Sequence, residues 1–271
     1  MNLQIDGRAA YAYTGGKVFD PKLPTVVLVH GALGDHSVWA LQSRSLAHHG
    51  CSVLAVDLPG HGRSAGPGLD SVDALTDWLL HLLKTAGVSR ALLVGHSMGS
   101  LIALETAARL GTDALGLVMV GSAFPMKVSS VLLDTAANEP LRAIDMVIAL
   151  SHSSLASKPS APAPGFWLRG VDRALYRRNQ QAHSEAGFGN LFHRDFSLCN
   201  AYTAGLETAQ RVRCPVSIVV GIRDQMTPTA ASRSLAAALS AETILAPSGH
   251  ALMGEAPEAV LAAIRSRVPR N

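Results

Sequence analysis

The chain has 271 residues, 48% of them hydrophobic, and a net charge of +3, which suits one large α/β domain or two small ones with a well-buried core. Its scattered basic residues give no reason to expect nucleic-acid binding, and its three widely spaced cysteines argue against a disulfide framework or a zinc site (Cys51, Cys199 and Cys214). Since there is no signal-peptide pattern and no apolar run of about 18 residues, we expect a cytoplasmic protein without a membrane span.

The first half of the chain alternates between apolar, strand-like runs and amphipathic, helix-like runs. An opening hairpin is predicted around Asp6 and Gly7. Helix periodicity and end signals then separate further helical segments from the buried strands between them. The predicted order is strand 25–31, a strand with a Gly-rich loop at 51–62 after helix 37–50, helix 71–87, strand 90–97, helix 98–111 and strand 114–123.

A long segment then interrupts this alternation. Residues 124–196 contain helical pieces and no strand-like run, so we predict a helical cap inserted after the sixth strand, with residues 1–123 and 197–271 forming the core. Within the cap, "SKPSAPAPG" at 157–165 indicates an exposed loop; a disordered linker fits this stretch but not its apolar flanks. The alternation resumes with strand 214–224, helix 228–240, strand 241–250 and helix 256–268.

Strands that alternate with helices predict a mostly parallel, eight-stranded sheet with helices on both faces. In such sheets the active site lies outside the carboxyl ends of the strands. Ser97, Asp224 and His250 each lie at the end of a predicted strand, in that chain order. A serine hydroxyl becomes nucleophilic when an imidazole takes its proton, and a carboxylate fixes the tautomer of that imidazole. Ser97 could instead be only a helix N-cap.

Five motifs in the same order resemble those of the α/β-hydrolase superfamily, and the resemblance spans nearly the whole chain. They are "VHGALG", "DLPGHGRS", "GHSMGS", "GIRDQMTP" and "SGHALMGEAPEAV". The resemblance implies an α/β-hydrolase fold in which Ser97 is the nucleophile, Asp224 the acid and His250 the base. It also implies an oxyanion hole formed by the backbone N–H groups of Ala32 and Met98, with no metal or cofactor.

The remaining motif residues are expected to have structural roles. His30 would order the oxyanion loop, His96 would support the turn, and Asp57 would shape the loop after its strand. Thr227 is expected to cap the next helix, and Glu255 to lie in the first turn of the last one.

Side chains of the cap leave two alternatives open. Several apolar residues could line an acyl pocket or could equally form the core under the cap (Leu33, Phe124, Met126, Phe166 and Trp167). Arg169, Arg173 and Arg177 share one helical face. They could hold a substrate carboxylate, although a solvated face is favoured.

The predicted function is hydrolysis of a small ester, lactone or thioester through an acyl-enzyme. Carbon–carbon bond hydrolases of aromatic-ring breakdown, perhydrolases and acyltransferases share the triad and remain alternatives. Epoxide hydrolases and haloalkane dehalogenases are disfavoured because they have an aspartate in place of Ser97. A slow-turnover ligand receptor is a minority alternative, since fold alone does not settle function. The expected partner is a small-molecule acyl substrate, and the oligomeric state is left open.

Overall fold

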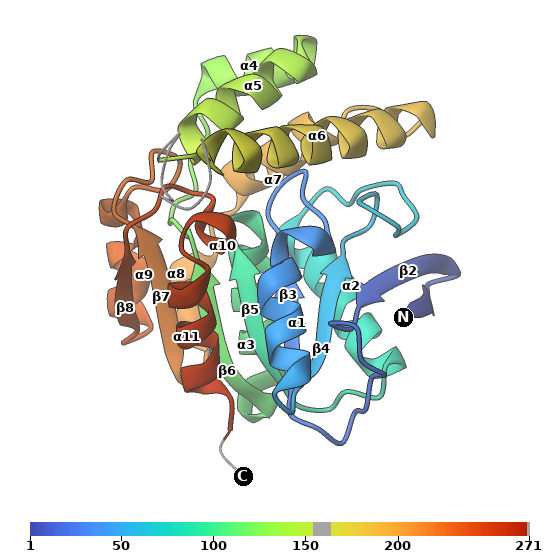
Figure 1. Ribbon diagram of the computed structural model, residues 1–271, viewed down its shortest axis with the longest axis vertical. Helices are drawn as coiled ribbons and strands as arrows, with labels where there is room; N and C mark the ends of the chain where they lie inside the picture. The colour runs from blue at the N-terminus through green and yellow to red at the C-terminus, as the bar shows by residue number, and fades with distance from the viewer. Residues whose placement is uncertain (154–163, 270–271) are drawn as a thin grey trace.

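The computed structural model describes residues 1–153 and 164–269, and it describes the side chains of these residues except those of 164–166. Its centre is a single sheet of eight strands in the order β1-β2-β4-β3-β5-β6-β7-β8 (Figure 1). The strands are β1 Asn2–Ile5, β2 Arg8–Tyr13, β3 Thr25–Val29, β4 Ser52–Asp57, β5 Ala91–His96, β6 Ala114–Val120, β7 Val216–Gly221 and β8 Glu242–Ala246.

The hairpin β1–β2 joins the sheet antiparallel to β4, and the strands from β4 across to β8 pair in parallel. Every residue of β3, β4, β5 and β7 is buried, as expected for strands covered on both faces. β8 forms one edge and is largely exposed. Because these strands are parallel, their carboxyl ends meet at one edge of the sheet, below the cap in Figure 1.

Helices cover both faces. One apolar cluster joins the sheet to α1 and α11, and another joins it to α2 and α3 on the opposite face. The helices of the core are η1 His36–Trp39, α1 Ala40–His48, α2 Val72–Thr85, α3 Met98–Leu110, η2 Gly111–Asp113, α8 Gly205–Ala209, η3 Thr229–Ser232, α9 Arg233–Ala238, α10 Leu252–Glu255 and α11 Pro257–Arg267.

A helical cap lies between β6 and β7 in the sequence and over the carboxyl edge of the sheet (Figure 1). Its helices are α4 Ser130–Asn138, α5 Pro140–Ser151, α6 Pro164–Glu185 and α7 Leu191–Ala201. They share an apolar cluster that includes Leu132, Ile144 and Phe192 and also contains Leu33 from the core. The cap therefore packs on the loop that follows β3.

The structure confirms the predicted fold class and the position of the cap helices, and it adds detail at several boundaries. α7 continues past Phe196 to Ala201, and the short helix α10 was not predicted. Most of the predicted loop 157–165 lies outside the described residues; its last two residues, Pro164 and Gly165, begin α6. In the described part of the chain, no helix combines the length and apolarity that crossing a bilayer requires.

Candidate active site

Ser97 occupies a strained turn between β5 and α3. Its φ of 51° and ψ of −120° place a non-glycine residue in a sparsely populated backbone region. The serine N–H donates to Val120 O at 2.9 Å, and Ser100 Oγ donates to Ser97 O at 2.6 Å. The Ser97 side chain makes no capping hydrogen bond to α3. Its hydroxyl is therefore presented at the carboxyl edge of the sheet rather than used as an N-cap.

The two glycines of "GHSMG" are explained by close backbone approach. A Cβ on Gly95 would clash with the carbonyl oxygen of Gly99, and a Cβ on Gly99 would clash with the carbonyl oxygens of Val29 and His30. Side chains at these positions would force α3 away from β3 and β5. The tight strand-to-helix turn therefore depends on glycine at both sites.

Asp224 and His250 form a buried pair at the ends of β7 and β8. His250 Nδ1 lies 2.8 Å from Asp224 Oδ2, and both side chains are almost fully buried. Burial alone would raise the pKa of Asp224. The neighbouring imidazole and hydrogen bonds from Thr227 outweigh burial and lower that pKa below its ordinary value. Asp224 is thus held as a carboxylate, which fixes the Nδ1–H tautomer of His250.

Thr227 supports this pair instead of capping a helix. Its hydroxyl donates to Asp224 Oδ2 at 2.7 Å, while its N–H and that of Met226 donate to Oδ1, both at 2.8 Å. The N-cap of η3 is Pro228. The expectation for Thr227 is therefore corrected: the turn after β7 folds back so that its donors orient the carboxylate.

Two further histidines of the motifs are neutral supports. His96 Nε2 donates to His250 O at 2.9 Å. His30 Nδ1 donates to Gly31 O at 2.8 Å, and His30 Nε2 accepts from Leu58 N–H at 3.1 Å. Each ring is buried and uses one nitrogen as a donor. Both histidines therefore hold loops around Ser97, as the sequence predicted.

The loop after β3 is held by the cap. Leu33 has a φ of 56° and lies one residue beyond Ala32. Its N–H donates to Asp195 Oδ2 of α7 at 2.8 Å, and its carbonyl accepts from Asn179 Nδ2 of α6 at 2.9 Å. Asp195 also accepts from His61 Nε2 at 2.9 Å. Buried hydrogen bonds from two cap helices thus fix both sides of the strained residue beside Ala32.

Replacing Asn179 with alanine should therefore lower kcat about 10- to 100-fold, because the Ala32 amide shifts when its loop loses the hydrogen bonds of the Asn179 amide to Leu33 O and Gly34 O. KM should change little, since Asn179 lines neither cavity described below. Steady-state kinetics with p-nitrophenyl butyrate measures both constants.

Gln180 offers a matched control for this experiment. It is also a buried amide of α6, but its Oε1 accepts from Phe192 N–H inside the cap. Gln180→Ala should reduce stability while retaining kcat. Equal losses of kcat in the two variants would show that Asn179 acts only through the stability of the cap.

Glu255 connects the His250 loop to the cap. It lies at the end of α10, not in the last helix, and its carboxylate accepts from Gly249 N–H at 2.6 Å. The N–H and the hydroxyl of Ser153 also donate to it, both at 2.9 Å. In addition, Ser151 O accepts from His250 N–H at 2.7 Å. The expected position in the first turn of the last helix therefore does not account for Glu255, whose carboxylate instead joins the His250 loop to the cap.

A cavity of about 220 Å³, here called the serine cavity, lies between the strand ends and the cap. Ser97, Ala32 and His250 line its floor, and Met126, Leu132 and Phe196 are among its apolar walls. Lys127 is the one formally charged side chain among its described lining residues. The cavity can therefore receive an apolar group attached to the Ser97 hydroxyl.

The structure places the other candidate pocket residues differently. Leu33 is fully buried in the cap cluster, because its strained backbone turns the side chain away from the site. Phe124 packs edge-on against Tyr202 at 6.0 Å, and Trp167 is 74% exposed. None of these three lines the serine cavity, whereas Met126 does. The side chain of Phe166 lies outside the described side chains.

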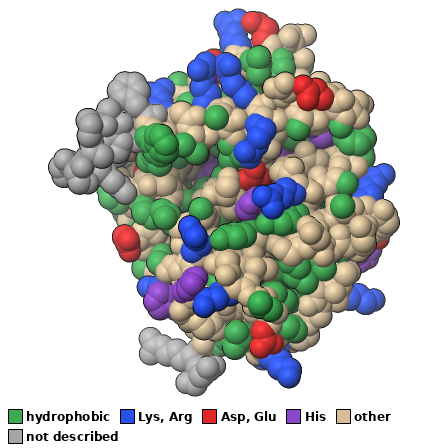
Figure 2. All heavy atoms as spheres, turned by 45° about the vertical axis from the view of Figure 1, so that its right-hand side comes forward, with side chains coloured by type: hydrophobic (Ala, Val, Ile, Leu, Met, Phe, Trp, Pro, Cys, Tyr) green, Lys and Arg blue, Asp and Glu red, His purple; other side chains and the backbone are tan. Residues whose placement is uncertain are grey.

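The cap arginines are largely paired with acids. Figure 2 shows Lys and Arg side chains gathered toward the top of the face, where the cap lies. Arg173 and Arg177 bind Asp145 of α5, at 2.6 and 3.1 Å, and Arg178 binds Asp35 at 2.6 Å. Arg173 and Arg177 of the predicted helical face therefore bridge cap helices. Arg169 makes no ion pair among the described residues.

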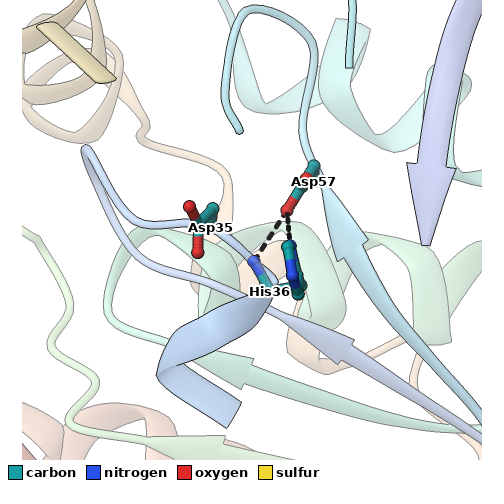
Figure 3. Close-up of side chains that lie close together, drawn as sticks. All are labelled: Asp35, His36 and Asp57. Carbon is teal, nitrogen blue, oxygen red and sulfur yellow. Dashed lines mark hydrogen bonds and ion pairs between the residues drawn. The ribbon is translucent and has the colours of Figure 1, made fainter. Parts of the chain in front are cut away.

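Asp35, His36 and Asp57 bring three possible metal-ligand atoms within 4.8 Å of one another (Figure 3). Asp57 Oδ1 accepts from the N–H and Nδ1 of His36, at 2.7 and 2.8 Å. Asp35 accepts from Ser37 and Arg178. These hydrogen bonds explain why the three side chains lie together, since they connect η1 to the end of β4. They are consistent with a loop-shaping role for Asp57.

The buried histidines predict loss of stability in mild acid. Burial, and secondly a neighbouring histidine, lower the pKa of His30 to about 4 and that of His96 to about 3. In the unfolded chain both titrate near 6.5. Below that pH the unfolded state binds more protons, so the free energy of unfolding should fall by about 1.4 kcal/mol per pH unit for each histidine until its folded pKa is reached.

Urea unfolding at pH 6.5, 5.5 and 4.5 measures this slope, and His30→Gln should reduce it. His61 does not offset the loss. Its pKa is raised although burial, the largest influence, lowers it, because the Asp195 carboxylate and its hydrogen bond favour the charged ring. The stability from His61 is complete below pH 6.5 and is lost only as the pH rises through the raised pKa. A flat profile between pH 6.5 and 4.5 would contradict the assignment of buried, neutral rings.

Comparison with known proteins identifies the family and the fold of the chain. The model of the family described as "Alpha/beta hydrolase family" matches residues 26–263. An enol-lactonase from Burkholderia xenovorans LB400 superposes with a TM-score of 0.83 at 20% identity, over 98% of this chain and 99% of that one. An esterase described as thermophilic gives a TM-score of 0.77 at 23% identity, over 98% and 95%.

Sequence relatives match a shorter stretch. The 2-succinyl-6-hydroxy-2,4-cyclohexadiene-1-carboxylate synthase of Escherichia coli O9:H4 is 37% identical over 101 residues, which are 37% of this chain and 39% of the synthase. The chain thus matches well under half the length of these curated relatives.

Proposed function

Because the chain is an enzyme that belongs to the alpha/beta hydrolase family, we propose that it is a serine hydrolase that cleaves a small carboxylic ester, lactone or thioester. The observation that carries the proposal is the arrangement of three side chains. The strained Ser97 and the Asp224-bound His250 line one apolar cavity, and the Asp224–His250 contact of 2.8 Å leaves Nε2 of the imidazole available.

Acylation follows from this arrangement. Ser97 Oγ attacks the carbonyl carbon while its proton passes to His250 Nε2, and the carbonyl electron pair moves to oxygen. The N–H groups of Ala32 and Met98 receive that oxyanion; neither donates a hydrogen bond elsewhere in the described part of the chain. When the tetrahedral intermediate collapses, the bond to the leaving group breaks and the departing oxygen or sulfur takes the proton from His250.

Deacylation repeats these steps with water. His250 takes a proton from water, and the resulting hydroxide attacks the acyl carbon. The bond from the acyl carbon to Ser97 Oγ then breaks, and the serine regains its proton from the imidazolium. Asp224 remains ionised throughout and stabilises that imidazolium.

The second candidate function is carbon–carbon bond chemistry on a substrate that carries a carboxylate. It is considered because one of the sequence relatives is a synthase whose name contains a carboxylate. A carboxylate ligand calls for paired cationic groups. In the serine cavity the formally charged lining residue among those described is the exposed Lys127. This sparse, mostly apolar lining favours neutral acyl groups, so we rank ester and lactone cleavage above the alternative.

The test is steady hydrolysis of p-nitrophenyl acetate and butyrate at about pH 7 to 8. We expect many turnovers per protein molecule, with butyrate at least as good as acetate because of the apolar walls. A single release of p-nitrophenol without further turnover would support the slow-turnover ligand receptor instead.

A further inference from the structure

A second cavity, here called the side cavity, adjoins Ala32 and His250, which also line the serine cavity. Its volume is about 160 Å³, and its walls come from η1, α10 and α6. Ala32 and His250 line both cavities, whereas Ser97 lines only the serine cavity. The two cavities therefore meet at the reacting centre of the proposed function.

Because Ser97 lines only one of the two cavities, the acyl part and the leaving group of an ester can each be assigned to one cavity. In the acyl-enzyme the acyl carbon is bonded to Ser97 Oγ, so the acyl chain must occupy the cavity that Ser97 lines. The leaving group receives its proton from His250 and is not bonded to the serine. It therefore belongs in the cavity that His250 lines and Ser97 does not.

The polar groups of the side cavity indicate which leaving groups it accepts. Ser151 is 4% exposed, and its Oγ has no hydrogen-bond partner among the described residues. Such a buried hydroxyl is costly unless a ligand or water satisfies it. The Ser151 carbonyl accepts hydrogen bonds from the N–H groups of His250 and Ala251, but these bonds do not involve the Ser151 hydroxyl.

A carboxylate supplies the formal charge of the side cavity. Asp172 of α6 is the one formally charged side chain among its described lining residues; its carboxylate is 26% exposed, and its Oδ2 lies 3.0 Å from Nε2 of the buried His152. His96 is neutral near pH 7 because burial lowers its pKa to about 3. Glu255, next to the wall residue Gly254, directs its carboxylate to Gly249 and Ser153. An anionic group would thus be repelled, and a cation or a neutral hydrogen-bonding group would be accommodated.

We propose that the side cavity binds the alcohol part of the substrate, and that Ser151 and Asp172 select neutral, hydroxylated or cationic alcohols over anionic ones. This inference rests on the proposed function. As the C–O bond breaks, its electron pair stays on the alcohol oxygen, which takes the proton from His250 Nε2. The alcohol then leaves through the side cavity while the acyl group remains on Ser97.

Three butyrate esters with alcohols of similar size test the charge preference. The alcohols are 2-(dimethylamino)ethanol, which is cationic at neutral pH, neutral 3-methylbutanol and anionic 3-hydroxypropanoate. We expect kcat/KM for the cationic ester to exceed that for the anionic ester about tenfold, and Asp172→Asn to reduce this ratio about fivefold. Asp134→Asn is the matched control, because it removes a charge from an exposed position of α4 outside both cavities. It should leave the ratio unchanged.

A second comparison tests the hydroxyl. The ratio of kcat/KM for 2-hydroxyethyl butyrate to that for propyl butyrate should fall about fivefold in Ser151→Ala, as for the loss of one hydrogen bond. Faster cleavage of the anionic ester, or ratios unaffected by both Asp172→Asn and Ser151→Ala, would overturn the inference while p-nitrophenyl butyrate is still hydrolysed. Absence of any hydrolysis by the wild type, p-nitrophenyl butyrate included, would overturn the proposed function and this inference with it.

Discussion

Replacing Ser97 with alanine is expected to lower kcat for p-nitrophenyl butyrate about 10⁶-fold, to the level set by binding and the oxyanion hole alone. The structure offers no second hydroxyl in the same position among its described residues, since Ser97 alone occupies the turn between β5 and α3. Alanine fits this turn without a larger side chain, so the fold should be retained. Steady-state kinetics measures the loss of kcat, and circular dichroism of the variant checks that the fold is retained.

Ser100→Ala is the control for this experiment. Ser100 is a buried serine of the same helix, and it donates to Ser97 O rather than facing the cavity. Its loss should reduce stability and retain most of the turnover. If Ser97→Ala kept more than about a hundredth of the wild-type kcat, Ser97 would not be the nucleophile and the acyl-enzyme mechanism would fail.

The core of the fold could be predicted from local patterns. Buried parallel strands such as β3 and β5 give continuous apolar runs, and the helices between them have their own periodicity and end signals. Gly95 and Gly99 flank Ser97 because the turn tolerates no Cβ there, so the motif itself encodes local geometry. The sequence also predicts that Asp224 and His250 lie at the same edge of the sheet as Ser97, because each is at the end of a predicted strand.

The supports contributed by the cap could not be predicted in the same way. Asn179 and Asp195 contact Leu33 across 146 and 162 residues of sequence, and Glu255 contacts Ser153 across 102. No periodicity relates residues so far apart; only the packing of the cap on the core brings them together. One available signal was chemical: a buried-looking Asn or Asp in an otherwise amphipathic helix requires a polar partner.

The same reasoning explains why the sequence does not separate pocket residues from core residues beneath the cap. Apolar side chains beneath a cap can face either the cavity or the cap core, and hydrophobicity does not distinguish the two. Leu33 and Met126 are both buried, yet only Met126 lines the serine cavity. The direction in which each side chain points is decided by the backbone conformation of its residue. For Leu33 this is the left-handed conformation, which hydrogen bonds from the cap hold in place.

Asp224→Asn is expected to lower kcat by about 10⁴ while leaving the protein folded, as when the acid of a comparable triad is replaced. Asp224 Oδ1 accepts from two backbone N–H groups, those of Met226 and Thr227. In the variant the amide oxygen should keep this position, which directs the NH₂ group toward His250 Nδ1. Nδ1 must then act as an acceptor, so the imidazole proton moves to Nε2 and that nitrogen can no longer take the proton of Ser97.

The pH dependence and a second variant distinguish this explanation from a general loss of structure. The wild-type carboxylate has a lowered pKa, so its protonation should not limit kcat above about pH 5. The Asp224→Asn variant should be slow at every pH from about 5 to 9, because its defect is a tautomer and not a titration. Glu255→Gln is the control, since that carboxylate contacts the His250 loop through Gly249 and not the imidazole. A larger loss of kcat in Glu255→Gln than in Asp224→Asn would mean that another carboxylate holds His250 during catalysis.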